Sequence, residues 1–236
     1  MKRKTRGKKS IGKMFFKKKS TVLIIISLLI AALLVYFFVF SSSTTVYEAI
    51  PYTAAIIDQL AISHPNTTFI QNAKNTLIST GYSVDYYNYS QITVNFYKQL
   101  PSKRYSIIIL RTHSCVGNYT KLTSLYTSEI YDEWTYPLEQ TRNQVTAVQI
   151  IEGRTIYFAV TSNFIKTLDS CRNCVVIMMG CNGLNKTDMA KAFIEKGANA
   201  YISWDGSVSQ EHTDNAADQL IRNLISKNQT IGEAIN

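Results

Sequence analysis

The sequence predicts an α/β fold built on a mostly parallel sheet. Two uninterrupted apolar runs, residues 106–110 (SIIIL) and 175–179 (VVIMM), are typical of strands buried on both faces. The region after residue 51 also alternates strand-like and helix-like periods, which favours parallel strands joined by crossover helices. Residues 120–168 interrupt this pattern and predict an antiparallel insertion at the edge of the sheet or over its top.

Five elements are expected before the insertion, alternating between strand and helix. The first helical pattern stops at Gly81, and the second, shorter one is closed by Pro101, because glycine and proline end helices. The first strand ends in an acidic residue, Asp58. The expected elements cover residues 54–58, 68–80, 82–87, 92–100 and 106–110.

The insertion and the second half are assigned in the same way. Alternating apolar and polar residues over 122–130 and 144–160 predict strands, with a tight turn at 151–154. The parallel pattern then resumes, with Gly197 capping one helix and residues 230–233 spaced as a capping box that opens another. The remaining expected elements are strands over residues 175–179 and 200–204 and helices over 188–196 and 214–226.

The N-terminal region predicts a membrane anchor. The formal net charge is +9, but ten of the 25 basic residues lie within residues 1–20, which leaves 15 basic residues against 16 acidic ones in the remainder. Residues 21–40 contain no charge, proline or glycine, and a helix of this length spans roughly 30 Å, the thickness of the hydrocarbon core. A cleavable signal has a shorter apolar core, so we favour an uncleaved anchor.

The positive-inside rule orients this anchor as a single-pass span of the cell membrane. The basic tail, residues 1–20, stays in the cytoplasm beside anionic head groups, and the main domain lies outside. Beyond the anchor, residues 41–51 form a Ser/Thr-rich spacer and residues 52–236 form one domain. Sites with the Asn-x-Ser/Thr pattern fit an external domain and occur at Asn66, Asn88, Asn118, Asn185 and Asn228.

Each of the two buried strands is followed by a chemically capable residue. His113 comes after the first apolar run, and Cys181 comes after the second, directly behind a glycine. Because the carboxyl ends of parallel strands meet at one edge of a sheet, both side chains are expected there. An imidazole can accept the proton of a thiol and later protonate a leaving amine, while backbone N–H groups hold the oxyanion. Taken alone, Cys181 has a plainer alternative as a buried, inert thiol.

This arrangement resembles the caspase-like cysteine peptidases, a group that includes caspases, gingipains, clostripain, legumain, separase and the CHAT domains. The segments IIILRTHS and VVIMMGCNG match its two motifs, and AKAFIEKGANAYISWDGSVS is similar to the segment after the catalytic cysteine in CHAT and gingipain-like domains. The likeness covers roughly residues 54–226. It implies a three-layer α/β/α sandwich with a mostly parallel sheet and an antiparallel β insertion, here preceded by one transmembrane helix.

The resemblance also implies roles for individual residues. His113 would be the general acid/base and Cys181 the nucleophile, with the backbone N–H groups of Cys181 and Ser114 as oxyanion donors. The family usually has His-Gly at this point, and Ser114 keeps the N–H group but adds a side chain near the substrate. A catalytically inactive binding or sensing domain on the same fold is therefore the alternative.

The substrate pocket is predicted less directly. Relatives that cleave after Arg or Lys place an acidic residue in this pocket. Asp205, with Trp204 as a wall, is one candidate, and Asp58 at the same edge of the sheet is another. Each of the two acids is alternatively a cap of the adjoining turn or helix.

The other cysteines allow several interpretations. Cys171 and Cys174 form a single C-x-x-C pair, which favours a disulfide outside the cell over a zinc site, because zinc needs four ligands. Cys115 is the rival nucleophile, a resting-state disulfide partner for Cys181, or a packed thiol.

The predicted function is that of a membrane-anchored cysteine endopeptidase that hydrolyses a protein or peptide substrate through an acyl-enzyme. We expect no metal and no other cofactor. Nucleic-acid binding, the remaining hypothesis for the basic tail, is disfavoured because the excess charge lies beside the membrane segment and the domain is near neutral.

Overall fold

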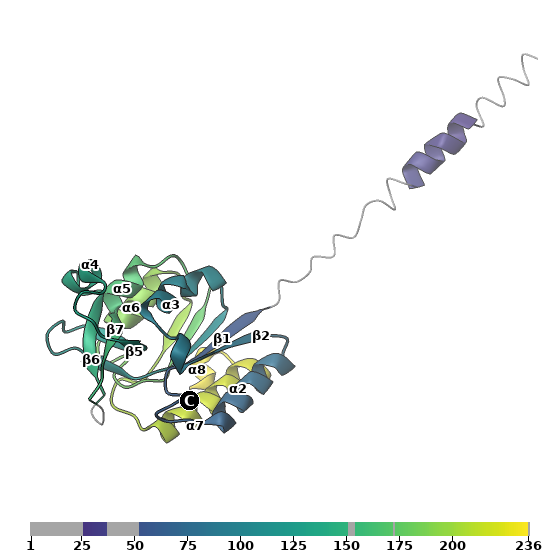
Figure 1. Cartoon of the computed structure of the whole chain (residues 1–236). Helices are drawn as coiled ribbons and strands as arrows, with labels where there is room; N and C mark the ends of the chain where they lie inside the picture. Colours follow the sequence, from purple (N-terminus) through teal and green to yellow (C-terminus); the bar gives the residue numbers. More distant parts are fainter. Residues whose placement is uncertain (1–25, 37–51, 151–153, 172, 236) are drawn as a thin grey trace, which may run out of the picture. The chain divides into compact units, whose positions relative to one another are not determined.

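The computed structural model describes residues 26–36, 52–150, 154–171 and 173–235 (Figure 1). The chain divides into two units, residues 1–50 and 51–236, which are treated separately. In the first unit, residues 26–36 form a helix with exposed apolar side chains. Within the described ranges, no helix is both long and apolar enough to cross a membrane. Residues 21–25 and 37–40 of the expected anchor lie outside the described residues, so the anchor stays a prediction.

The second unit is organised around a parallel sheet, as the sequence predicts. Its five strands run in the order β2-β1-β3-β8-β9, and every neighbouring pair is parallel. The two uninterrupted apolar runs form β3 and β8, which pair with each other near the centre of the sheet. The strands are β1 (Thr53–Asp58), β2 (Ser83–Asn88), β3 (Ile107–Arg111), β8 (Val175–Met178) and β9 (Ala200–Ile202).

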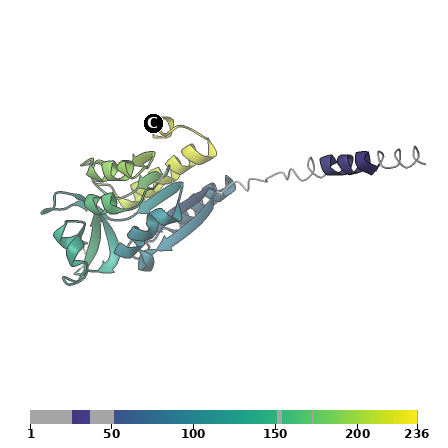
Figure 2. The same cartoon turned by 90° about the horizontal axis from the view of Figure 1, so that it is seen from above.

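Helices cover both faces of this sheet (Figures 1 and 2). Side chains of β1 alternate between two cores: Ala55 and Ile57 pack into one, and Ala54 and Ile56 into the other. The first core is covered by α3 (Val94–Gln99), α5 (Ser162–Thr167) and α6 (Asp188–Glu195). The second is covered by α2 (Thr67–Ser79), α7 (Gln210–Ile221), the π-helical turn η3 (Arg222–Ser226) and α8 (Ile231–Ala234).

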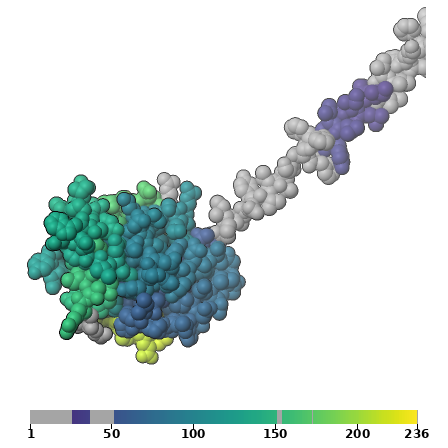
Figure 3. All heavy atoms as spheres, in the orientation of Figure 1, coloured from purple at the N-terminus to yellow at the C-terminus, as the bar shows by residue number. Residues whose placement is uncertain are grey.

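The antiparallel insertion forms a second sheet in the order β4-β5-β7-β6. Its inner residues Leu125, Phe158 and Val160 join the same core as α3, α5 and α6, so it packs over one face of the parallel sheet and is not hydrogen-bonded to its edge. In the space-filling view its green residues lie on one side of the domain, next to the blue early residues (Figure 3). Its elements are β4 (Ser114–Val116), β5 (Thr123–Ile130), α4 (Pro137–Thr141), β6 (Val145–Gln149) and β7 (Ile156–Thr161).

Several boundaries differ from the sequence expectation. Helix α7 begins at Gln210, earlier than expected, because the side chain of Ser209 accepts the N–H of His212 and caps its first turn. The expected capping box before α8 is present. The pattern did not predict β4, α4 or α5, and three residues of the expected turn, 151–153, lie outside the described part.

Candidate active site

The segments that carry His113 and Cys181 adjoin at the carboxyl edge of the parallel sheet. Leu110 of β3 is the register partner of Met178 of β8, and the N–H of Met179 donates to the carbonyl of Leu110 at 2.9 Å. Just beyond the strands, the hydroxyl of Ser114 donates to the carbonyl oxygen of Cys181 at 2.5 Å. The structure therefore brings together the two segments that the sequence pattern places at one edge.

Ser114 and Gly180 fit one another. A methyl group on Gly180 would collide with the Ser114 hydroxyl and with the carbonyl oxygen of Thr112. Ser114 is 9% exposed, and its side chain points toward the Cys181 segment that it bonds. Ser114 therefore ties the two site segments together, and the lack of a side chain at Gly180 leaves room for its hydroxyl.

We expect Gly180→Ala to lower the free energy of unfolding by about 1–3 kcal/mol, because the added methyl group forces apart two packed segments. Denaturant titration followed by circular dichroism measures this change. Gly206→Ala is the matched control, since a methyl group there meets no atom within 4 Å. Equal stability losses in the two variants would contradict the close packing described at Gly180.

His113 is held through its main chain and its ring. Its N–H donates to the side-chain oxygen of Gln59 at 3.1 Å, and Gln59 is fully buried at the end of β1. The imidazole meets the ring of His64 edge-on, with 5.8 Å between ring centroids, and lies 5.7 Å from the ring of Tyr126. Its Nε2 atom is shielded from solvent. Sequence reasoning missed Gln59, His64 and Tyr126, because none of them lies in a motif with His113.

Cys181 and its turn are held by the loop that follows β9. Its sulfur lies 3.4 Å from both the N–H and the carbonyl of Val208, so it can donate to one group as a thiol and accept from the other. The N–H interaction strengthens when the sulfur carries a negative charge. The Cys181 turn is fixed by backbone bonds from Asn182 to Gly206 and from Leu184 to Trp204, each 2.8 Å. The 204–208 loop therefore forms one wall of the site.

The contacts that hold His113 and Cys181 come from different parts of the chain. The imidazole of His113 contacts side chains that follow β1 and belong to β5, whereas the sulfur of Cys181 contacts the loop after β9. Catalytic hydrogen bonds are often long or poorly aligned before substrate binds. The geometry therefore provides adjoining segments and a half-buried thiol, and a dyad requires the imidazole within hydrogen-bond reach of the sulfur.

Asp58 has a different role from the substrate-pocket role considered for it. It is 1% exposed and pairs with the buried guanidinium of Arg111 at 2.8 Å. Arg111 also binds both carboxylate oxygens of Asp214 on α7, at 2.8 Å each, and donates to the carbonyl of His64 at 2.7 Å. These acids raise the pKa of Arg111 despite the opposing effect of burial. The network locks β1, β3, α7 and the His64 loop together beneath the site, and this explains the burial of Asp58.

Trp204 and Asp205 lie on the loop that pairs with the Cys181 turn. The indole N–H of Trp204 donates to the hydroxyl of Thr213 at 2.8 Å, and that hydroxyl donates to the carbonyl of Met179. Trp204 is therefore fixed between the first turn of α7 and the end of β8. Asp205 is exposed beside it, where its carboxylate is open to solvent.

The other cysteines are distributed as follows. Cys171 and Cys174 form a disulfide, in agreement with the sequence expectation, and Cys115 and Cys181 are free. Cys115 packs beside Tyr126 and Val148 on the outer face of the antiparallel sheet, where burial raises the pKa of its thiol. A raised pKa leaves less thiolate at neutral pH, which disfavours Cys115 as a nucleophile. Among the described residues, no three His, Cys, Asp or Glu side chains are grouped to hold a metal ion.

No family model matches the chain, and no curated protein matches it either.

Proposed function

We propose that the protein is a membrane-anchored cysteine endopeptidase with a caspase-like three-layer sandwich and a His113/Cys181 dyad. The observation that carries the proposal is the bond between the Ser114 hydroxyl and the Cys181 carbonyl, which joins the segments that follow two neighbouring buried strands. Helices on both faces of the parallel sheet and an antiparallel sheet over one face support the caspase-like arrangement.

The chemistry follows from the two side chains. His113 takes the proton of the Cys181 thiol, and the resulting thiolate attacks the carbonyl carbon of a peptide bond. The N–H groups of Ser114 and Cys181 hold the oxyanion, and the imidazolium protonates the leaving amine as the acyl-enzyme forms. Water, deprotonated by His113, then hydrolyses the thioester and restores the thiol. The exposed carboxylate of Asp205, on the loop beside the Cys181 turn, fits a basic side chain of the substrate.

The N-terminal region supports a location for the domain outside the cell membrane. Residues 26–36 are helical and expose apolar side chains, as expected of a helix whose solvent is lipid. The ten basic residues that precede position 20 favour a cytoplasmic tail and an external main domain.

A specific observation also favours a second candidate, a catalytically inactive domain that binds a peptide. The Nε2 atom of His113 is shielded, and the Cys181 sulfur is engaged by both backbone groups of Val208. A site that stays in this arrangement with a bound peptide would recognise it and not cleave it.

Labelling of the full-length protein, in detergent, with electrophilic peptidyl probes carrying Arg, Lys or Asp separates the two candidates. The peptidase proposal predicts covalent labelling that Cys181→Ala abolishes and that the matched Cys115→Ala variant retains. If the protein prefers the Arg and Lys probes, and if Asp205→Asn weakens this preference, the role of Asp205 would be supported. Absence of labelling in a folded protein, including after limited proteolysis, would favour the inactive domain, and labelling lost only in Cys115→Ala would overturn the choice of nucleophile.

A further inference from the structure

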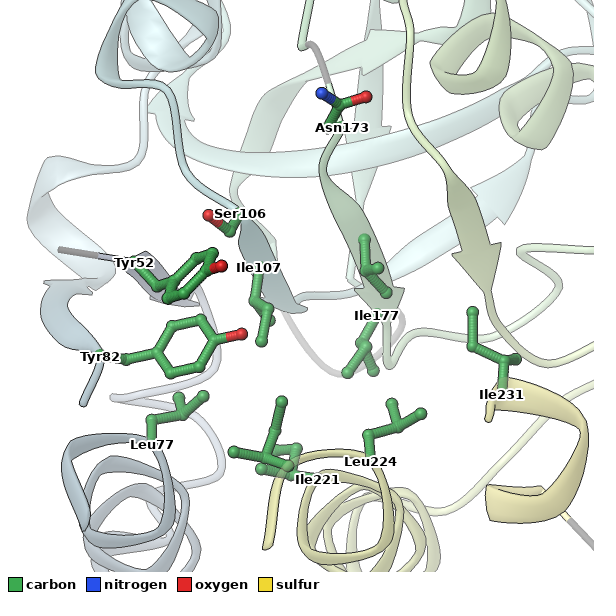
Figure 4. A pocket seen from close by; sticks show the side chains of 12 residues that line it. Tyr52, Leu77, Tyr82, Ser106, Ile107, Asn173, Ile177, Ile221, Leu224 and Ile231 are labelled. Carbon is green, nitrogen blue, oxygen red and sulfur yellow. The ribbon is translucent and has the colours of Figure 1, made fainter. Parts of the chain in front are cut away.

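A cavity of about 510 Å³ lies at the amino-terminal edge of the parallel sheet, opposite to the edge that carries Cys181 (Figure 4). Tyr52 and Tyr82 immediately precede β1 and β2, and Ile107 and Val175 are the first residues of β3 and β8. All four line the cavity. Its volume is in the range of pockets that hold small molecules. The cavity takes no part in the chemistry proposed for the Cys181 edge.

The cavity has an apolar body. Ile107 and Ile177 form its sheet side, and Leu77, Ile221 and Leu224 from the helices close the other side (Figure 4). Leu224 lies in the π-helical turn η3, an irregular form of helix that is frequent at functional sites. Apolar side chains on both walls favour a ligand whose body is hydrocarbon.

The polar groups of the cavity gather beside the strand starts. The rings of Tyr52 and Tyr82 lie with 5.6 Å between their centroids, and Figure 4 shows both hydroxyl groups directed toward the cavity, with Ser106 beside Tyr52. Asn173 adds an amide. Among the described lining residues none carries a charged side chain, so the cavity lacks a partner for an ionised head group. A neutral group with hydrogen-bonding oxygens fits this end.

A residue at the rim of the cavity lies close in sequence to the predicted anchor. Tyr52 is 66% exposed at this rim and follows Phe40, the last residue of the expected membrane segment, by 12 residues. A chain of that length reaches at most roughly 40 Å. Tyrosine is also enriched at the level of lipid head groups, since its ring is apolar and its hydroxyl is polar. Because the predicted anchor precedes Tyr52 by so few residues, membrane lipid is the ligand most accessible to the domain.

We propose that this cavity binds one acyl chain of a neutral membrane lipid, with the hydrocarbon between the sheet and η3 and the neutral head group against the hydroxyls of Tyr52 and Tyr82. The inference relies on the predicted anchor and is independent of peptidase chemistry.

The test uses the full-length protein in phosphatidylcholine nanodiscs with two photoreactive probes, each carrying a diazirine near the end of its acyl chain. One probe is a monoacylglycerol, and the other is a fatty acid at alkaline pH, where its head group is ionised. Mass spectrometry locates the cross-links. We expect cross-links at Ile221, Leu224 and Ile225, stronger by about threefold or more for the neutral probe, because the cavity holds no charge to pair with a carboxylate.

Leu224→Trp fills the cavity and is expected to reduce these cross-links by roughly fivefold or more, because it displaces apolar contact area. Ile194→Trp is the matched control: Ile194 is a 47% exposed isoleucine on α6, on the other face of the sheet, and its substitution should leave the cross-links unchanged. The wild-type map is decisive even if a variant fails to fold. Cavity residues labelled no more than the exposed Ile62 and Leu138 would overturn the proposal, and so would stronger labelling by the ionised probe.

Discussion

Replacing Arg111 with methionine is expected to lower the free energy of unfolding by about 3–5 kcal/mol, because it leaves two buried carboxylates without a partner. Arg111 is 1% exposed, and its guanidinium binds Asp58 and Asp214 at 2.8 Å. Solvent cannot compensate for the loss of this cation, since each acid is at most 2% exposed. Guanidinium titration of the full-length protein, followed by circular dichroism, measures the change.

Two further variants make the test specific. Arg222 of η3 forms a partly exposed ion pair with Asp218 of α7, one helical turn before it. Arg222→Met removes this pair and should lower the free energy of unfolding by less than about 1 kcal/mol. Adding Asp58→Asn and Asp214→Asn to Arg111→Met removes the uncompensated charges and should recover part of the lost stability. A loss below 1 kcal/mol in Arg111→Met would show that the ion-pair network does not hold the site scaffold together.

His113→Ala is expected to reduce peptide hydrolysis by about 10²–10⁴-fold, the usual contribution of a general acid/base. Cys181→Ala should reduce it to the background, since no acyl-enzyme can form. Turnover of the peptide preferred in the labelling experiment measures both effects. The double variant should be no slower than Cys181→Ala alone, because the members of a dyad act as a unit.

The control for this pair is His64→Ala. The ring of His64 meets the ring of His113 at a steep angle and forms its own side-chain contact with Ser63, so its removal should affect turnover far less than loss of His113. Full turnover in His113→Ala would exclude His113 as the acid/base. Equal losses in His64→Ala and His113→Ala would show that the imidazole acting on Cys181 is not uniquely that of His113.

The parallel sheet could be predicted because the residues of its central strands form a pattern that is recognisable without the rest of the chain. Residues 107–110 and 175–178 are apolar without a break, and this pattern reports burial on both faces regardless of what lies elsewhere in the chain. The strand β4 could not be predicted in this way. It has three residues, Ser114–Val116, and its pairing with β5 depends on the turn after β3 and not on its own composition.

The partners of the site residues depend on contacts between distant parts of the chain. Arg111 and Asp214 are separated by 103 positions, and His113 and Gln59 by 54. No periodic pattern in the sequence indicates such pairs. The sequence therefore suggested Asp58 as a pocket residue, whereas in the structure it is the ion-pair partner of Arg111. The proximity of the segments that contain Ser114 and Cys181 could be predicted, because the carboxyl ends of neighbouring parallel strands lie at one edge of the sheet.

The most direct test of the dyad is the rate at which iodoacetamide alkylates each free cysteine of the full-length protein as a function of pH, measured by mass spectrometry of peptides after quenching and digestion. Cys115 is the internal reference: burial raises the pKa of its thiol, so its thiolate and its rate should increase only toward alkaline pH. If His113 activates Cys181, alkylation of Cys181 at neutral pH should be about tenfold or more faster than in His113→Ala. A Cys181 rate profile that is identical in the wild type and in His113→Ala would contradict the dyad.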